Sequence, residues 1–258
     1  MADSAGELRI DWDAPWLAPL RDLRPAAESS DWRAALSSLA RQRGVTTAQG
    51  RPVSFVAGDD AGRAAYEAHI FATGRVPTRD DPHDLFNALV WLAYPRTKAA
   101  LNARQAAELA RDGVRGTRGP VRDAATLIDE SGLLLIADDE ACAALARFDW
   151  PWLFAARRRC WGAAWRPFAF GHALLDKLRA PYKRLTAAVV CLPAAAASAE
   201  QADRLAARWV ERTALAPRLL GHLPVLGIPG WWPANEEPAF YADPEVFRRA
   251  RHGERSLG

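Results

Sequence analysis

The sequence predicts an α+β fold that is predominantly helical, with a small sheet and an extended C-terminal tail rich in Pro and Trp. Three observations predict it. Apolar residues recur at helical spacing in most segments, strand-like apolar runs are few and short, and the last 40 residues lack periodicity. The 258 residues, half of them hydrophobic and a quarter charged, have the composition of a globular protein. We expect residues 1–258 to form a single domain with a core over about 10–250.

The first half of the chain predicts helices with one strand among them. Asp81 is suited to cap a helix, Pro82 fits the first helical position because it has no N–H to leave unpaired, and Pro95 stops the same helix. Similar start and stop residues bound the neighbouring segments. The predicted elements are short helices within residues 1–50, a strand over 51–58, and helices over 59–74, 82–94 and 97–113.

The second half predicts a β-hairpin over residues 124–137. Two apolar runs flank Asp129-Glu130-Ser131-Gly132, and Gly132 can adopt a positive φ. Beyond the hairpin we expect helices over 139–148, 151–164 and 171–179, a strand over 184–192 and a helix over 198–215. The tail should be held to the body by its aromatic residues, which are Trp231, Trp232, Phe240, Tyr241 and Phe247.

Composition excludes several classes of protein. The N-terminal residues carry no basic and apolar targeting pattern, and no apolar run approaches the ~18 residues of a membrane span, so we expect a cytoplasmic protein without a membrane partner. Cys142, Cys160 and Cys191 are far apart and have no CxxC spacing. They are predicted to be reduced and buried, with neither a disulfide framework nor a structural zinc site.

Candidate catalytic residues stand at the start of the helix predicted over 82–94. His83 and Asn87 are four residues apart, and His83 and Asp84 lie in the first turn, where an imidazole can serve acid–base chemistry or bind an anion. The alternative is that His83 and Asn87 satisfy backbone groups of the adjoining loop. Asn is a poor metal ligand and no HxxxH or HExxH motif is present, so we expect no metal site here.

Candidate binding residues gather around this helix start and the loop after the next helix. Guanidinium groups among glycines can approach a phosphate or carboxylate, although no named nucleotide motif is present. For Lys98 and Asn102 the alternative is a solvated helix face. For the arginines of the loop the alternative is a surface loop in which they pair with nearby acidic residues. Asp129 and Glu130 add carboxylates that could neutralise the arginines or bind Mg²⁺. The candidate binding residues are Arg79, Lys98, Asn102, Arg115, Arg118, Arg122 and Asp123.

A competing function is suggested by residues 147–184. This segment holds nine basic and two acidic residues, a net charge of +7, interleaved with tryptophans and phenylalanines. Single-strand nucleic-acid surfaces combine basic charge with aromatic faces. The same aromatic residues could instead form the core, with the arginines on the outer face, and we favour that interpretation for most of the tryptophans.

Four stretches, YEAHIFATGRVPTRDDPHDLFNALVWLAYPRTKAALN, RGPVRDAATLIDESG, FGHALLDKL and LPVLGIPGWWPANEEPAFYADPEVFR, together resemble the bacterial family known as domain of unknown function 3025. The resemblance covers roughly residues 10 to 250. It implies one full-length domain in a bacterial cytoplasm, and it implies no activity, cofactor or site residue.

Two functions therefore remain in competition. In the first, the loop 75–84, the helix starts at 82 and 97 and the loop 113–123 form a pocket that recognises an anion, such as that of an enzyme acting on phosphoesters. Arg79, Arg118 and Arg122 would hold the anion, and His83, assisted by Asp84, would exchange a proton. In the second, the basic aromatic segment binds nucleic acid or protein without catalysis.

Overall fold

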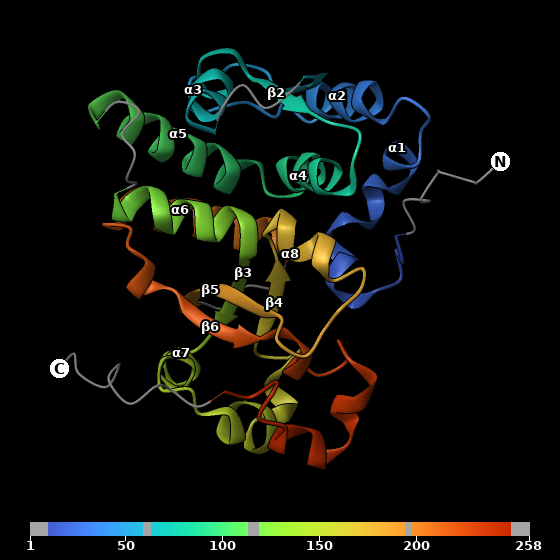
Figure 1. Cartoon of the computed structure of the whole chain (residues 1–258), viewed down its shortest axis with the longest axis vertical. Coiled ribbons are helices and arrows are strands. Elements are labelled where there is room, and N and C mark those ends of the chain that lie inside the picture. The colour runs from blue at the N-terminus through green and yellow to red at the C-terminus, as the bar shows by residue number, and fades with distance from the viewer. Residues whose placement is uncertain (1–9, 59–62, 113–118, 194–197, 249–258) are drawn as a thin grey trace.

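The computed structural model describes residues 10–58, 63–112, 119–193 and 198–248 (Figure 1). Its α-helices and strands form the mostly helical α+β fold that the sequence predicts. In chain order the helices are α1 (Arg24–Ala27), α2 (Trp32–Gln42), α3 (Arg63–Thr73), α4 (Pro82–Ala93), α5 (Pro95–Asp112), α6 (Pro120–Ser131), α7 (Asp139–Ala146), α8 (His172–Lys177) and α9 (Ala199–Arg212). The strands are β1 (Ser54–Ala57), β2 (Arg75–Thr78), β3 (Gly132–Ala137), β4 (Arg166–Ala169), β5 (Thr186–Pro193) and β6 (Gly221–Pro224).

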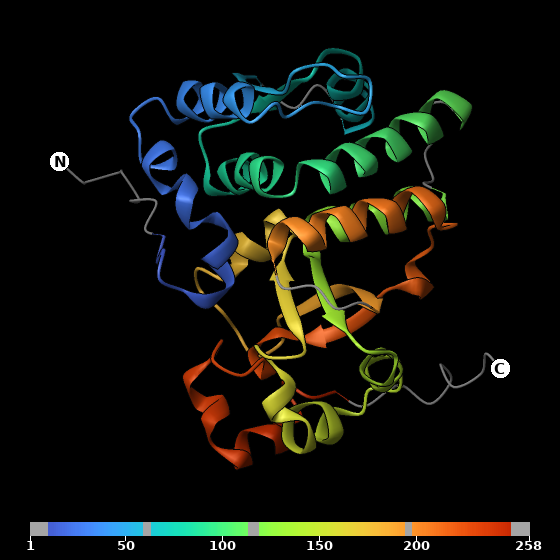
Figure 2. The same ribbon diagram turned by 180° about the vertical axis from the view of Figure 1, so that it is seen from behind.

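The elements are stacked in layers along the long axis of the molecule. At one end α2 and α3 accompany a two-stranded parallel sheet of β1 and β2, and α4 and α5 lie beneath them (Figure 1). Next come α6 and α8, and α9 packs against α5 on the face seen in Figure 2. The four-stranded sheet follows, in the order β4-β3-β5-β6, and α7 with the C-terminal segment closes the other end.

The segment 124–137 is not a hairpin, so that prediction was wrong. Residues 120–131 form α6, whose Ala124, Ala125 and Ile128 are fully buried at helical spacing. Every residue of β3 is buried, and β3 pairs in parallel with β5, in the register Leu134 with Val190. A strand covered on both faces reads as a continuous apolar run, and this is the pattern that was mistaken for one arm of a hairpin.

The predicted start of α4 is confirmed in detail. The Asp81 side chain accepts a hydrogen bond from the backbone N–H of Asp84 at 2.8 Å, and Pro82 occupies the first helical position. The helix ends before Pro95, which opens α5. The capping therefore fixes where His83 emerges, one residue inside the helix.

Other predicted elements differ in extent. The helix expected over 151–164 is a six-residue π-helix, Pro151–Ala156, which ends where Arg157 leaves helical geometry at φ −108° and ψ 19°. A 3₁₀ turn follows at Arg158–Cys160, and Gly162 at φ 74° prevents any helical continuation beyond it. The short strands β2, β4 and β6 were not predicted. The C-terminal segment from Val225 consists of 3₁₀ turns, and its aromatics pack against the core as expected, with Trp231 and Phe247 buried.

The cysteine prediction was wrong in part. Cys142 on α7 and Cys191 on β5 form a disulfide across 49 residues, whereas Cys160 is a free, half-buried thiol. Spacing along the chain carries no information about such a contact, since it depends on how α7 packs on the sheet. Among the helices in the described part of the chain, none combines the length and the hydrophobicity that a bilayer span requires.

Candidate functional site

A polar cavity of about 340 Å³ lies where α3, α4 and α5 face α6 and α8. Its size is within the range of small-molecule sites. The lining is dominated by ionisable and amide side chains, and comprises Gly58, Tyr66, Glu67, Pro77, Arg79, His83, Asp84, Asn87, Gln105, Arg122, Thr126, Asp129, Glu130 and His172. A second hollow, of about 570 Å³, lies near η1 (Pro15–Leu23) and α8, and its largely apolar lining holds no comparable group of reactive side chains.

His83 reaches the cavity from the capped start of α4. Its neighbour Asp84 turns back toward the loop and accepts hydrogen bonds from the Arg79 backbone N–H at 2.6 Å and from the Arg79 guanidinium at 3.1 Å. Burial alone would raise the pKa of Asp84, but the Arg79 hydrogen bonds outweigh it and lower that pKa. Asp84 thus anchors Arg79, and the ring of His83 is left to face α8.

His172 and two carboxylates reach the cavity through a close crossing of two backbones. The N–H groups of Phe170 and Gly171 both donate to the carbonyl of Gly132, at 3.0 and 2.8 Å. A Cβ on Gly171 would lie 2.4 Å from the Gly132 nitrogen and 2.5 Å from the Glu130 carbonyl oxygen. Only glycine permits this approach, which brings the start of α8 against the end of α6 and sets His172 beside Asp129 and Glu130.

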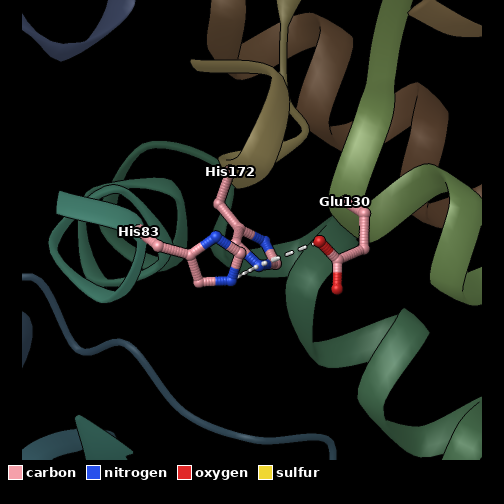
Figure 3. Close-up of side chains that lie close together, drawn as sticks. All are labelled: His83, Glu130 and His172. Atoms are coloured by element: carbon pink, nitrogen blue, oxygen red, sulfur yellow. Dashed lines mark hydrogen bonds and ion pairs between the residues drawn. The ribbon is translucent and has the colours of Figure 1, made fainter. Parts of the chain in front are cut away.

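Three donor atoms converge at this crossing (Figure 3). The Nε2 atoms of His83 and His172 are 3.1 Å apart, and the two rings meet edge to face with an interplanar angle of 77°. Glu130 places a carboxylate oxygen 3.8 Å from His172 Nε2. The ligand atoms of all three side chains lie within 4.8 Å of one another.

Burial and neighbouring charge decide the charge of His172. Its pKa is lowered to about 4, mainly because burial penalises the imidazolium, and the nearby Lys98 and His83 lower it further against the opposing effect of Asp129. His172 is therefore a neutral imidazole at physiological pH. Its Nδ1 faces Asp129, with 3.7 Å between Nδ1 and Oδ2.

A buried hydrogen-bond network supports the floor of the cavity. The ammonium group of Lys98, a residue only 5% exposed, donates to Asp129 and, at 2.8 Å, to the amide oxygen of Asn87. Asn87 donates in turn to the Tyr66 hydroxyl at 3.1 Å. Burial would raise the pKa of Asp129, but Lys98 and then His172 lower it, so the carboxylate is ionised. Asn87 and Lys98, chosen from the sequence as four-residue neighbours of other polar groups, thus belong to one network.

A fourth carboxylate, Glu67 on α3, lines the same cavity. The side-chain N–H₂ of Asn102 donates to its carboxylate at 2.7 Å and to its backbone carbonyl at 2.9 Å. Burial, and next the negative charge of Asp129, raise the pKa of Glu67 to about 7, while Lys98, Asn102 and Arg122 oppose that rise. A carboxyl group with such a pKa can take up and release a proton near neutral pH.

Arg122 brings positive charge to the cavity from the first turn of α6. Its Nε is buried, and no described residue accepts a hydrogen bond from it. An unpaired buried guanidinium N–H is costly, and an anion in the cavity would satisfy it.

The candidate residues named from the sequence fall into four groups. His83, Asp84, Asn87, Arg79 and Arg122 line the cavity. Lys98 and Asn102 are not lining residues but bind its walls. Asp123 lies on α6 outside the lining, and Arg115 and Arg118 lie outside the described residues. Tyr66, Glu67, Asp129, Glu130 and His172 complete the site without having been selected as site residues.

Different signals existed for the residues that were missed. His172 follows Gly171 at a helix start, and Asp129 and Glu130 form an acidic pair, so each had a local signal. The false hairpin assigned those acids to an exposed turn, whereas they end a helix that points at α8. Glu67 has no local signal, since a Glu in an amphipathic helix is usually exposed.

The aromatic residues of segment 147–184 are mostly core. Trp150, Trp161, Trp165, Phe154 and Phe170 are buried. The segment therefore does not present its basic and aromatic side chains on a common exposed face, which a single-strand binding surface requires.

A family model described as "Protein of unknown function (DUF3025)" matches residues 53–251. No curated protein and no solved structure matches the chain. The matched range contains all the lining residues of the cavity.

Proposed function

Since the chain belongs to the DUF3025 family of proteins of unknown function, its activity has to be inferred from the cavity, and we propose that it is an enzyme acting on a small anionic molecule, in the first instance a phosphoester. The observation that carries the proposal is the meeting of His83 and His172 at 3.1 Å in a cavity that Arg122 also lines. Two imidazoles, and a guanidinium whose buried Nε has no partner among the described residues, supply a reacting centre and an anion-binding group.

The energetic cost of the surroundings favours catalysis over a structural role. Lys98 and Asp129 are ionisable groups largely removed from bulk water, and apolar residues of the same volume would stabilise the fold at least as well. Perturbed carboxyl and imidazole groups that gather in one cavity are typical of active sites. In this arrangement Arg122 binds the anion, the imidazole pair is the reacting centre, and Glu67 accepts a proton on another wall of the cavity.

The proposal is tested with chromogenic phosphomonoesters and phosphodiesters, together with thermal shifts in inorganic phosphate. We expect turnover by the purified protein, a ~100-fold or greater loss in His172→Ala, and a ~10-fold or greater rise in KM in Arg122→Gln. His69→Ala, which changes an exposed histidine of α3, is the matched control. Absence of turnover of every ester, together with no stabilisation by phosphate, would reject the proposal.

A further inference from the structure

We infer that His83, His172 and Glu130 form a binding site for one divalent transition-metal ion. The three donors come from the start of α4, the start of α8 and the end of α6. His83 and Glu130 are 47 residues apart in sequence, and Glu130 and His172 are 42 apart, so no short sequence motif contains the three donors. The inference deepens the proposed function, since it concerns the same cavity, but it stands on donor geometry alone.

The distance between the imidazoles fits two ligands of one ion. With metal–nitrogen bonds of ~2.0–2.1 Å, the 3.1 Å between the Nε2 atoms corresponds to a ligand–metal–ligand angle of ~98°. This value lies between the octahedral and tetrahedral angles. The separation of the two nitrogens is therefore that of two ligands of one ion.

Glu130 supplies the third ligand after a side-chain rotation. Two ligands of one tetrahedral ion are ~3.4 Å apart at these bond lengths, and Glu130 Oε2 is 3.8 Å from His172 Nε2. The largest separation among the three donors, up to 4.8 Å, exceeds that value by ~1.4 Å. Rotation about the side-chain bonds of a half-buried glutamate covers such a distance.

The surroundings of His172 match those of a metal ligand. Its Nε2 faces the other two donors. Its Nδ1 is buried, has no hydrogen-bond partner among the described residues and lies 3.7 Å from the Asp129 carboxylate, which Lys98 holds in place. Histidine ligands commonly direct the second ring nitrogen at a carboxylate, and Asp129 is the carboxylate positioned for that role once it closes the remaining distance.

The charges around the cavity favour a bound cation. Glu67, Asp84, Asp129 and Glu130 are four carboxylates, against which stand Arg79, Arg122 and Lys98. With all of them ionised, one negative charge is left over, and with Glu67 protonated the charges balance. In both states a divalent ion makes the net charge of the cavity positive, which favours an anionic substrate.

The donor set selects the class of metal. Two imidazoles and one carboxylate suit Zn²⁺, Fe²⁺, Mn²⁺ or Co²⁺, whereas Mg²⁺ and Ca²⁺ prefer oxygen ligands. Three protein ligands leave positions for water or substrate, as in catalytic sites. The Nε2 lone pairs then hold the ion, and proton transfer is left to Glu67.

A hydrogen bond between the two imidazoles, with one Nε2–H donating to the other Nε2, is the alternative explanation of the 3.1 Å distance. It accounts for the two rings without an ion. The two explanations differ in whether the protein binds one Co²⁺ or Zn²⁺ ion per chain at these residues.

The experiment measures metal binding by the full-length protein after treatment with a chelator. Co²⁺ is titrated in and followed by its visible absorption, and Zn²⁺ is titrated by calorimetry. We expect one ion per chain, with affinity lowered more than ~100-fold in His83→Ala and in His172→Ala, because loss of a ligand should exceed the 10–100-fold effect of an outer partner. Glu130→Gln should weaken binding as well. His69→Ala and His222→Ala, which change exposed histidines, are the controls, and far-UV circular dichroism verifies that each variant folds.

Two outcomes would overturn the inference: no stoichiometric binding of Co²⁺ or Zn²⁺, or binding that survives in a folded His83→Ala, His172→Ala double variant. Metal binding is read without any substrate, so it is separable from the proposed function. Histidine-dependent binding without phosphoester turnover leaves the metal site standing and rejects the substrate class. Phosphoester turnover by a protein that binds no metal supports the substrate class and rejects the metal site.

Discussion

Replacing Glu67 by Gln should make the protein more stable, and only at neutral to alkaline pH. The pKa of Glu67 is raised from its ordinary 4.5 to about 7, first by burial and then by the negative charge of Asp129. Between these two pH values the native state keeps a proton that the unfolded chain has released. The free energy of unfolding therefore falls as pH rises through this window, and the loss is complete above pH 7.

The magnitude follows from the two pKa values. A difference from 4.5 to about 7 corresponds to at most about 3 kcal/mol at full ionisation. Glu67 lines a cavity and is partly open to water, so we expect about 2 kcal/mol. Glutamine has nearly the same shape, and its amide oxygen still accepts the hydrogen bond from Asn102, so the packing term is small.

Urea denaturation followed by tryptophan fluorescence, at pH 4.5 and at pH 8.5, measures the effect. The stability of Glu67→Gln minus that of the unmodified protein should increase by about 2 kcal/mol between the two pH values. Glu237→Gln, an exposed residue of the C-terminal segment, is the matched control and should show no such increase. If the free energy of unfolding of Glu67→Gln differed from that of the unmodified protein by the same amount at both pH values, the raised pKa of Glu67 would be refuted.

Three further outcomes follow from the structure. Gly171→Ala should destabilise the protein by ~2–4 kcal/mol in urea denaturation and lower metal affinity, because its Cβ would lie 2.4 Å from backbone and would displace His172; an unchanged midpoint would contradict the close crossing. Lys98→Met should cost ~3–5 kcal/mol by leaving Asp129 buried and unpaired, and adding Asp129→Asn should recover part of that loss; additive effects in this double-mutant cycle would contradict the pairing. Single-stranded DNA should bind with no more than weak, salt-sensitive affinity, since the aromatic residues of 147–184 are mostly buried; tight binding that is retained in His172→Ala would favour the nucleic-acid alternative.

Most helices could be predicted from the sequence, because capping residues and apolar periodicity depend only on residues close together in the chain. Asp81 and Pro82 fix the start of α4, and Ser198 with Gln201 forms a capping box that starts α9 close to where the sequence placed it. The failure at residues 124–137 has an equally physical cause. Ala124, Ala125 and Ile128 fit one helical face, but an apolar run read by alternation alone does not distinguish a buried helix from a strand.

The candidate site was predictable only in part, because its pieces are local and its geometry is not. The first-turn position of His83 was readable, since it depends on the cap. Its partner His172 lies 89 residues away and is delivered by the Gly132–Gly171 crossing, which no window of sequence describes. The pairing of Cys142 with Cys191 was missed for the same reason.

The polar network at the floor of the cavity joins the two halves of the molecule. Lys98 belongs to the α4–α5 layer, Asp129 to the α6–α8 layer, and their ion pair crosses the boundary between the layers. An apolar contact at this boundary would hold the layers together at less cost in desolvation. What an apolar contact cannot do is hold an ionised carboxylate beside the His172 ring, where Asp129 Oδ2 lies 3.7 Å from Nδ1. The ion pair is therefore better explained as the support of a reactive site than as a source of stability. Its desolvation cost supports a functional role for His83, His172 and Glu130.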